Sequence, residues 1–310
     1  MAKNLTICPI TEPVANANAR GEGTSGGAEI QVIEGKSALT GVGTGYGLRE
    51  GMTAIAGTDR MFRKHNVNET PTGYGYGPEN KALSEVMDLL KDPSFLDYID
   101  SRLGIMLAAK GGETFGRRGS VQKSVSFSTT PYTGTQLMQQ GHKADGNLVP
   151  THIPIHVTRY GMRYSINLED FEANPDHLYV YILTIIRGFP VGGSQTCLSN
   201  LVRPAVVMWN THRSLGGGLN PLGYTTENVD SAPNIDFFIK QANMHGMSFK
   251  IRGDYSVTLK ADDPKTQAMV EAGPTPLIQA ADEMFCEAME CMGLDPAAEL
   301  AKAKKMILED

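Results

Sequence analysis

The sequence predicts an α+β fold with an extended N-terminal arm. The chain has 310 residues, of which 41% are hydrophobic and 20% charged, so it is long enough to bury a core as one large domain or two small ones. Two patterns support the prediction. Apolar residues repeat at helical spacing in several segments, and they alternate every second residue in the middle of the chain, as in strands with one buried face.

Residues 1–80 are predicted to form the arm. Glycine is dense at 21–27, 41–51 and 71–78, and glycine raises the entropic cost of ordering a helix or a strand. Scattered apolar residues indicate that the arm gains order by lying across another surface, which neighbouring subunits would supply. We therefore expect that deleting residues 1–78 leaves a folded body that cannot assemble.

Residues 81–119 are predicted to be a helical segment. Apolar residues between 83 and 90 fall on one helical face, and a second helical pattern runs over 95–107. Ser94 is a candidate N-cap for the second helix, and Gly111 and Gly112 end it.

Residues 120–175 are predicted to contain a polar β-hairpin and several strands. The stretch 132–150 is polar and rich in turn residues, and Tyr160–Gly161 interrupts the strand pattern that follows it. The residues that continue the alternation after this interruption are Met162, Tyr164, Ile166 and Leu168.

Residues 176–310 are predicted to form a mixed α+β body. A helix over 178–189 should break at Gly188 or Pro190, because glycine and proline disfavour helix interiors. The remaining predicted elements are a helix over Thr196–Trp209, a strand pair over 248–261, a helix that starts at Asp263–Pro264, a helix over Pro276–Met292 with Gly293 after its last turn, and a short charged helix at the end.

Net charge and cysteine usage limit the functions that the sequence allows. The formal net charge of −6 gives no overall electrostatic reason to hold nucleic acid, although a local basic patch remains compatible with it. The four cysteines form no C-x-x-C pair, which favours reduced thiols in a cytoplasm. The N-terminus lacks the apolar core of a signal peptide, and the strongest apolar run, Leu178–Ile186, is too short to span a bilayer. We expect a protein that is made and used inside a cell, without a membrane partner.

Two glycine motifs resemble nucleotide-binding loops but lack their context. Residues 21–26 match G-x-G-x-x-G, yet neither a strand nor a good helix start flanks them. Gly35, Lys36 and Ser37 resemble the end of a P-loop, but Ile30 occupies the position of the required first glycine. We therefore predict no bound cofactor.

No group of residues has the pattern of a catalytic or metal site. His152 and His156 have zinc-helix spacing, but Pro154 and the alternation place them on a strand. Arg117–Arg118 could bind phosphate or an acidic surface, with a solvated turn as the simpler interpretation. We predict that the protein is not an enzyme and has no catalytic, cofactor-binding or metal-binding residue. If a site is assembled from distant residues, the first candidates are Arg117, Arg118, His142 and Asp145.

The passage from about 120 to 199 resembles HK97-fold major capsid proteins of tailed bacteriophages and related viruses. In that family an E-loop returns through a strand and the chain then enters a long spine helix. Tyr160–Gly161, Ser165–Ile166 and Leu168–Phe171 occupy the places of the family's strand segment here. The resemblance implies an HK97-like capsid fold with an extended N-terminal arm, an E-loop β-hairpin, a spine helix and a reduced axial domain.

The same resemblance implies a structural virion protein that assembles into a shell around the genome. Its partners would be copies of itself, with minor capsid or cement proteins as further candidates, and its contact with the genome would be non-specific at most. It would be assembled in the host cytoplasm and located in the virion. The alternatives are a minor capsid or tail protein, a cellular compartment shell, or an enzyme whose site is not readable from sequence.

Overall fold

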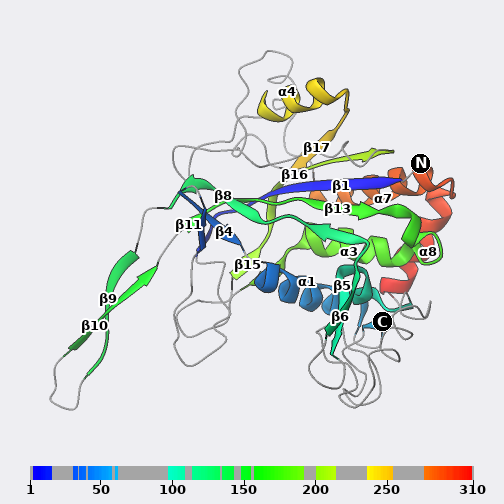
Figure 1. Ribbon diagram of the computed structural model, residues 1–310. Helices are drawn as coiled ribbons and strands as arrows, with labels where there is room; N and C mark the ends of the chain where they lie inside the picture. Colours follow the sequence, from blue (N-terminus) through cyan, green and yellow to red (C-terminus); the bar gives the residue numbers. More distant parts are fainter. Residues whose placement is uncertain are drawn as a thin grey trace.

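The structure, a computed structural model, describes residues 3–15, 31–33, 35–39, 41–57, 60–61, 97–108, 114–132, 135–142, 148–154, 157–191, 200–213, 236–253 and 276–308. An antiparallel sheet of nine strands organises them (Figure 1). At one edge, β17 (Lys250–Gly253) pairs with β16 (Pro204–His212), which pairs with β1 (Asn4–Thr11). The other edge of β1 pairs with two short strands in succession, β12 (Tyr160–Gly161) and β13 (Tyr164–Asn167). Strand β13 pairs next with β7 (Val121–Lys123), whereas β12 pairs with β8 (Ser126–Pro131), which is followed by β4 (Lys36–Leu39) and β3 (Gln31–Ile33).

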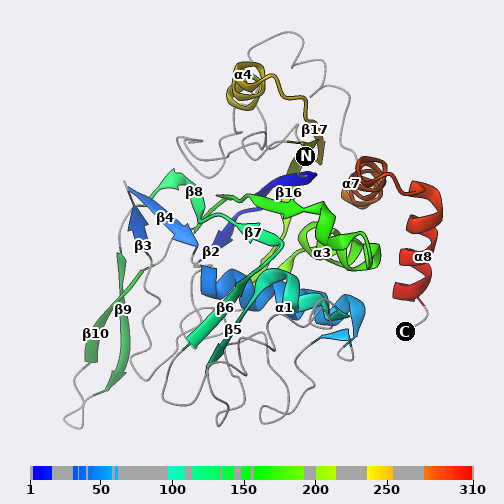
Figure 2. The same ribbon diagram turned by 45° about the vertical axis from the view of Figure 1, so that its right-hand side comes forward.

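The described residues also form four two-stranded sheets beside the main sheet. They are β9 (Thr135–His142) with β10 (Leu148–Pro154), β5 (Gly104–Ala108) with β6 (Thr114–Arg118), β14 (Phe189–Val191) with β15 (Asn200–Val202), and β2 (Val14–Ala15) with β11 (Val157–Thr158). The β9–β10 pair projects from the body in both views, so the segment predicted as an E-loop is a protruding hairpin (Figures 1 and 2).

Helices cover the two faces of the main sheet unequally. The helices on one face are α1 (Gly41–Ala56), α3 (Pro175–Arg187) and α7 (Leu277–Met292), with α8 (Pro296–Leu308) outside α3 and α7. The turns η4 (Ile99–Leu103) and η5 (Leu168–Phe171) complete this layer. Of the described helices, only α4 (Asp236–His245) lies over the other face (Figure 2). We call these the helix face and the open face of the sheet.

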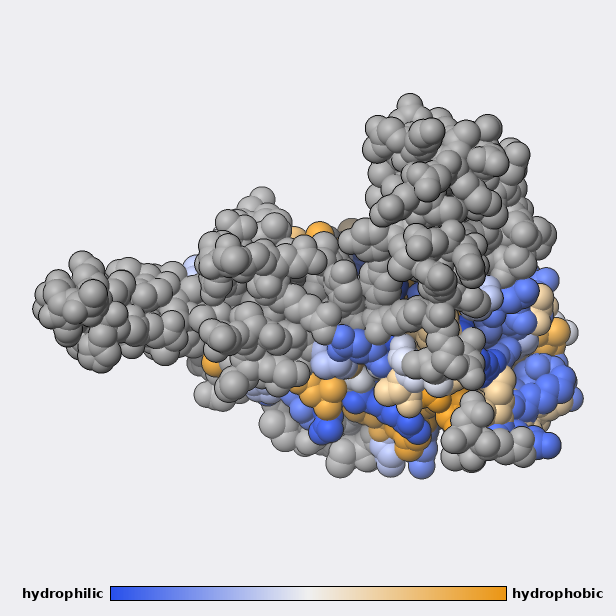
Figure 3. All heavy atoms as spheres, turned by 90° about the horizontal axis from the view of Figure 1, so that it is seen from below, coloured by the Kyte–Doolittle hydropathy of each residue, from blue (hydrophilic) through white to orange (hydrophobic). Residues whose placement is uncertain are grey.

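Two hydrophobic cores follow from this arrangement. The main core lies between the helix face and α1, α3 and α7, and α3 is buried from His177 to Ile186. The smaller core lies under α4, and its buried members are Cys8, Ile10, Val206, Met208, Phe238 and Ile251. Seen from below, the described surface carries small hydrophobic areas among hydrophilic ones (Figure 3).

The first strand shows that the prediction of an N-terminal arm that depends on other subunits is wrong. Strand β1 is central: it pairs with β16 along one edge and with β12 and β13 along the other, and all eight of its residues are buried. Leu5 and Ile7 enter the main core, while Cys8 and Ile10 enter the smaller one. The first strand therefore satisfies its backbone and its side chains within its own subunit.

The glycine-dense stretch 41–51 forms most of helix α1 rather than extended chain. A Cβ atom at Gly47 would lie 2.1 Å from the Pro190 carbonyl oxygen, and one at Gly51 would lie 2.7 Å from the Thr184 Cγ2 atom. Glycine at these positions lets α1 pack closely against α3 and β14. This packing outweighs the low helix propensity of glycine on which the prediction relied.

Two other predicted helices are wrong. Within the predicted helix over 95–107, the described residues form η4 and then strand β5. The predicted helix over Thr196–Trp209 is replaced in its described part by strands β15 and β16. Because both faces of β16 are buried, its apolar residues run continuously instead of alternating, and such a run can be mistaken for a helix.

Several sequence predictions are confirmed. Met162, Tyr164, Ile166 and Leu168 are buried as their alternation indicated. Helix α3 ends at Gly188, which has a φ of 84°, and α7 is followed by Gly293 in the left-handed conformation. The short C-terminal helix is α8. The predictions for residues 21–27, 71–78, 83–90 and 254–265 lie outside the described residues.

Candidate functional site

The open face of the sheet is polar where α4 does not cover it. Register places Asn210, Thr6, Ser165 and Gln122 in one row across β16, β1, β13 and β7, and His212, Asn4 and Asn167 in the next. Alternation along β13 explains the row, because Tyr164 and Ile166 enter the main core while Ser165 and Asn167 point the other way. Thr6 and His212 are linked by a 2.9 Å hydrogen bond between Oγ1 and Nε2.

A cavity of about 600 Å³ lies on this polar area. Its described lining residues are Asn4, Arg118, Gln122, Lys123, Ser124, Arg163, Ser165 and Asn167. None of these eight residues is acidic, three are basic, and the rest are amides or hydroxyls. The volume is typical of pockets that bind small molecules or a short piece of a polymer. The net charge of −6 gave no overall reason to bind nucleic acid but was compatible with a local basic patch. The described lining of this cavity, which is basic and contains no acidic residue, is such a patch.

Arg163 is one of the three basic residues that line the cavity. It directly precedes β13 on the open face, and its carbonyl oxygen accepts a 3.0 Å hydrogen bond from the Ser124 backbone N–H. Its Nε atom is buried and has no hydrogen-bond partner among the described residues. Burial raises the pKa of the neighbouring Cys8 thiol to about 12, and the positive charge of Arg163 offsets part of that increase. The Nε atom of Arg163 is thus a buried donor with unused hydrogen-bonding capacity.

Arg118 supplies a second guanidinium at the exposed rim. It ends β6, and its Nη2 atom donates a 2.6 Å hydrogen bond to Oε1 of Gln122. Because Gln122 lies opposite Ser165 on the open face, this bond holds Arg118 beside the same cavity. The two arginines therefore provide fixed positive charge at any physiological pH.

Lys123 is the third basic residue of the lining, and it is half-buried like Arg163. It lies opposite Tyr164, whose side chain belongs to the main core, and it also lines the cavity. Burial lowers the pKa of Lys123 to about 7, with a further contribution from the Arg49 guanidinium on α1. Near neutral pH, Lys123 therefore adds only part of a charge.

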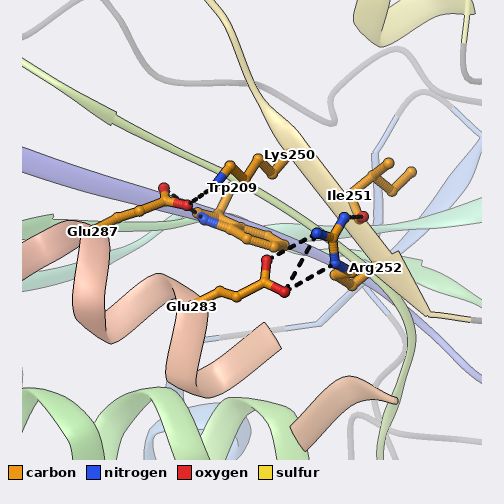
Figure 4. Close-up of polar contacts among 6 residues, drawn as sticks. All are labelled: Trp209, Lys250, Ile251, Arg252, Glu283 and Glu287. Carbon is orange, nitrogen blue, oxygen red and sulfur yellow. Dashed lines mark hydrogen bonds and ion pairs between the residues drawn. The ribbon is translucent and has the colours of Figure 1, made fainter. Parts of the chain in front are cut away.

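A second polar cluster connects α7 to the helix face of β16 and β17. The Trp209 Nε1 atom donates a 3.1 Å hydrogen bond to Oε2 of Glu287, which also pairs with Lys250 (Figure 4). Arg252 and Glu283 form an ion pair of 3.0 Å in the same view. Since each charge here faces an opposite charge, the cluster fastens α7 to the sheet.

The residues suggested from sequence do not come together as one site. Arg118 lines the cavity, whereas His142 ends strand β9 in the projecting hairpin (Figure 1). Arg117 lies in β6 opposite Ile105, so it is in a strand and not in a turn. His152 lies in β10 opposite Leu137. Asp145 and His156 lie outside the described residues.

Other predicted features have structural roles or stay untested. Gly35 forms the turn between β3 and β4 with a φ of 77°. Trp209 is a core residue. In the described ranges, no three histidine, cysteine, aspartate or glutamate residues lie close enough together to bind a metal ion. None of the helices in the described part of the chain combines the length and hydrophobicity that a bilayer crossing requires.

Sequence reasoning missed Arg163 and the polar row. A signal was present, because Arg163, Ser165 and Asn167 alternate with the apolar residues that identified the strand. Asn4, which lies opposite Asn167, is separated from it by slightly more than half of the chain. Only the pairing of β1 with β13 brings these residues together.

Comparisons with protein-family models and with curated proteins found no match. Among solved structures, the chain is similar to a chain of a CRISPR RNA-guided surveillance complex in a pre-nicking state, with a TM-score of 0.48 and 11% identity, over 87% of this chain and 99% of that one. A chain of a CRISPR RNA-guided surveillance complex gives a TM-score of 0.47, 12% identity and the same coverage. Csc2 of Thermofilum pendens gives 0.34 and 13%, over 68% of this chain and 66% of that one.

The capsid prediction is wrong in its family, fold, function, location and partners. The similar structures are subunits of CRISPR complexes and not capsid proteins. The described architecture agrees with this correction: the segment expected to be a long spine helix is α3, which has 13 residues and ends at Gly188, and the expected arm begins as the central strand β1. A homo-oligomeric shell and a place in the virion therefore have no support.

Proposed function

We propose that this chain binds the sugar–phosphate backbone of single-stranded RNA in the cavity on its open face, as a subunit of an RNA-guided complex. The observation that supports it is the cavity lining, which has basic and neutral polar residues and no acidic residue among the described positions. The similar structures have TM-scores below 0.5, so the binding site is argued from the cavity alone.

The charge of the cavity favours phosphate. A guanidinium forms strong, geometrically defined hydrogen bonds with phosphate oxygens. Arg163 is part-buried with an unused Nε donor, and Arg118 stands at the rim, so a phosphate could be held from the floor and from the edge. A buried, unsatisfied donor costs free energy until a ligand satisfies it, which makes Arg163 a preformed contact.

The neutral residues favour RNA over DNA. Side-chain amides and hydroxyls both donate and accept hydrogen bonds, as the ribose 2′-hydroxyl does. Asn4, Ser165 and Asn167 provide three such groups in adjacent positions. No aromatic residue is among the described lining residues, so base stacking is not offered there and recognition should be independent of sequence.

Binding of labelled single-stranded oligoadenylate to the full chain, followed by fluorescence anisotropy at low salt, tests this function. We expect Arg118→Gln with Arg163→Gln to weaken binding at least about tenfold, because each lost charged hydrogen bond is worth roughly 1.5–3 kcal/mol. The matched control is Lys302→Gln on α8, whose side chain is 71% exposed and paired with Glu299; it should leave affinity unchanged.

Two outcomes would refute the proposal. One is the absence of RNA binding by the wild-type chain. The other is binding that the double variant does not weaken. Oligodeoxyadenylate of the same length serves as the second ligand, and equal affinity for it would remove the role given to the amides and hydroxyls. That the chain has no catalytic activity remains a prediction from its sequence.

A further inference from the structure

We propose that Ser124 and Arg163 together hold one non-bridging oxygen of a backbone phosphate, so that Ser124 is a phosphate-binding residue of the cavity. This inference rests on the proposed function, because it names the two donors that receive the phosphate in the same cavity. It goes beyond that function by assigning the contact to an uncharged side chain and to one kind of ligand atom.

Strand register places the two side chains next to each other on the open face of the sheet. Lys123 lies opposite Tyr164 in the pairing of β7 with β13. The next opposite pair is Ser124 and Arg163, whose backbones are joined by a 3.0 Å hydrogen bond from the Ser124 N–H to the Arg163 carbonyl oxygen. Directly opposite residues of an antiparallel pair have their Cβ atoms about 4.5–5.5 Å apart. Since alternate residues of a strand share a face, Ser124 lies on the same face as Gln122, and both line the cavity.

Each of the two side chains has a buried polar atom that lacks a hydrogen bond. The Oγ atom of Ser124 and the Nε atom of Arg163 have no partner among the described residues. A buried donor without a partner costs free energy until a ligand satisfies it. Two such donors on directly opposite residues that line one cavity indicate a binding position for a single acceptor atom.

The chemistry of the two donors favours an oxyanion as this acceptor. The guanidinium of Arg163 is charged and can only donate, and the hydroxyl of Ser124 can donate as well. Rotation about the Cα–Cβ bond of Ser124 moves its hydroxyl between staggered positions, so it can turn toward an oxygen that enters the cavity. Hydrogen bonds to an ionised acceptor are about twice as strong as those between neutral groups. None of the described lining residues is acidic, so no carboxylate among them repels such an oxygen.

Ser124→Ala should raise the stability of the chain and lower its affinity for RNA. The variant removes a buried hydroxyl that has no partner, so the urea midpoint of the free chain should rise. Its affinity for labelled single-stranded oligoadenylate should fall about tenfold, because a hydrogen bond to a charged acceptor is lost. The salt dependence of binding should stay at its wild-type value, because the substitution removes no charge.

Ser126 in β8 provides the matched control. Its Oγ atom is also buried and lacks a partner in the described part of the chain, but Ser126 is not among the described lining residues of the cavity. Ser126→Ala should therefore raise the urea midpoint in the same way and leave the affinity for RNA unchanged. An equal loss of affinity in both variants would overturn the inference, because it would not depend on contact with the cavity. A lower urea midpoint in Ser124→Ala would also overturn it, because the hydroxyl would then already have a partner in the free chain.

Stereopure phosphorothioate oligoadenylates test the assigned ligand atom, because each replaces one of the two non-bridging oxygens with sulfur, a weaker acceptor. One of the two diastereomers should bind the wild-type chain less tightly than unmodified RNA, and this loss should be smaller in Ser124→Ala. An equal loss in both chains, or no loss with either diastereomer, would overturn the inference and leave the proposed function intact. If Ser124→Ala weakens binding of oligoadenylate and not of oligodeoxyadenylate, the contact is to the 2′-hydroxyl and the phosphate assignment is overturned. Failure of the wild-type chain to bind RNA would overturn both proposals.

Discussion

Removal of one arginine from the cavity should change the salt dependence of RNA binding by a defined amount. For single-stranded nucleic acid, each neutralised phosphate contributes about −0.7 to the slope of log K against log salt concentration. Arg163 and Arg118 are the two permanently charged residues of the described lining, so together they should contribute about −1.4. We therefore expect Arg163→Gln to make the slope less negative by about 0.7.

Fluorescence anisotropy titrations over a fourfold range of salt concentration provide the assay. Over this range the wild-type chain should lose about 2.5-fold more affinity than Arg163→Gln. Arg163→Lys keeps the charge and should keep the slope, although affinity falls because an ammonium cannot form the forked contact of a guanidinium. Lys302→Gln, on the surface of α8, should change neither quantity.

The result that would refute this reasoning is specific. If Arg163→Gln weakens binding and the slope stays at its wild-type value, then Arg163 acts on the shape of the cavity and not on a phosphate. A slope change of equal size in Lys302→Gln would show that total charge, and not the cavity, controls the salt dependence.

Three further predictions concern the scaffold of the cavity. Glu287→Gln should lower the free energy of unfolding by about 1–2 kcal/mol in urea titrations, because it weakens the acceptor of the Trp209 indole hydrogen bond; no change would mean that this bond is replaced by water. Gly188→Ala should destabilise by roughly 1–3 kcal/mol, because the residue has a φ of 84° and a Cβ atom would lie 2.5 Å from the Val202 carbonyl oxygen; wild-type stability would contradict the close approach. The pKa of Lys123 is about 7 in the folded protein against an ordinary 10.5, so the unfolded chain binds more protons between these pH values and the stability of the wild type should rise with pH in this interval. Lys123→Met should therefore be more stable than the wild type at pH 7, by a margin that shrinks by pH 9. An equal margin at both pH values would contradict the lowered pKa.

How far the sequence predicts this fold depends on whether a strand has one buried face or two. Strand β13 has one apolar face, and its alternation was recognised from Met162 to Leu168. Strand β16 has two, since Val207 and Trp209 enter the main core while Val206 and Met208 enter the smaller one. A continuous apolar run contains no period that separates a strand from a helix, so β16 was predicted as a helix.

The candidate site was predictable only in part for a related reason. Arg118 was named as a phosphate-binding candidate because two arginines beside glycine are visible locally. Prediction of Arg163 would have required the polar face of β13 to be considered as a binding surface. The position of Asn4 in the cavity could not be predicted from the sequence. The register between strands so far apart in the chain is fixed by the whole sheet and not by any local pattern.

The first strand provides a test that separates the fold described here from the one predicted from sequence. The sequence favoured a dispensable arm, whose removal with residues 1–78 would leave a folded body. In the structure, any such deletion removes β1 from the centre of the sheet. Removal of residues 1–13 alone should therefore abolish cooperative unfolding in urea, followed by circular dichroism.

The magnitude follows from the side chains that β1 buries. Leu5, Ile7 and Ile10 are fully buried, and burying such a side chain contributes about 1.5–3 kcal/mol, or roughly 5–9 kcal/mol together. That is comparable with the whole stability of a typical domain, about 5–15 kcal/mol, before the lost strand pairing on both edges is counted. A synthetic peptide of residues 3–15 should restore the transition when added to the shortened chain, because it can re-enter the gap between β16 and β13. A shortened chain that unfolds cooperatively at the wild-type urea midpoint would show that the central position of β1 is wrong, and the polar floor of the cavity, to which β1 contributes Asn4, would then have no basis.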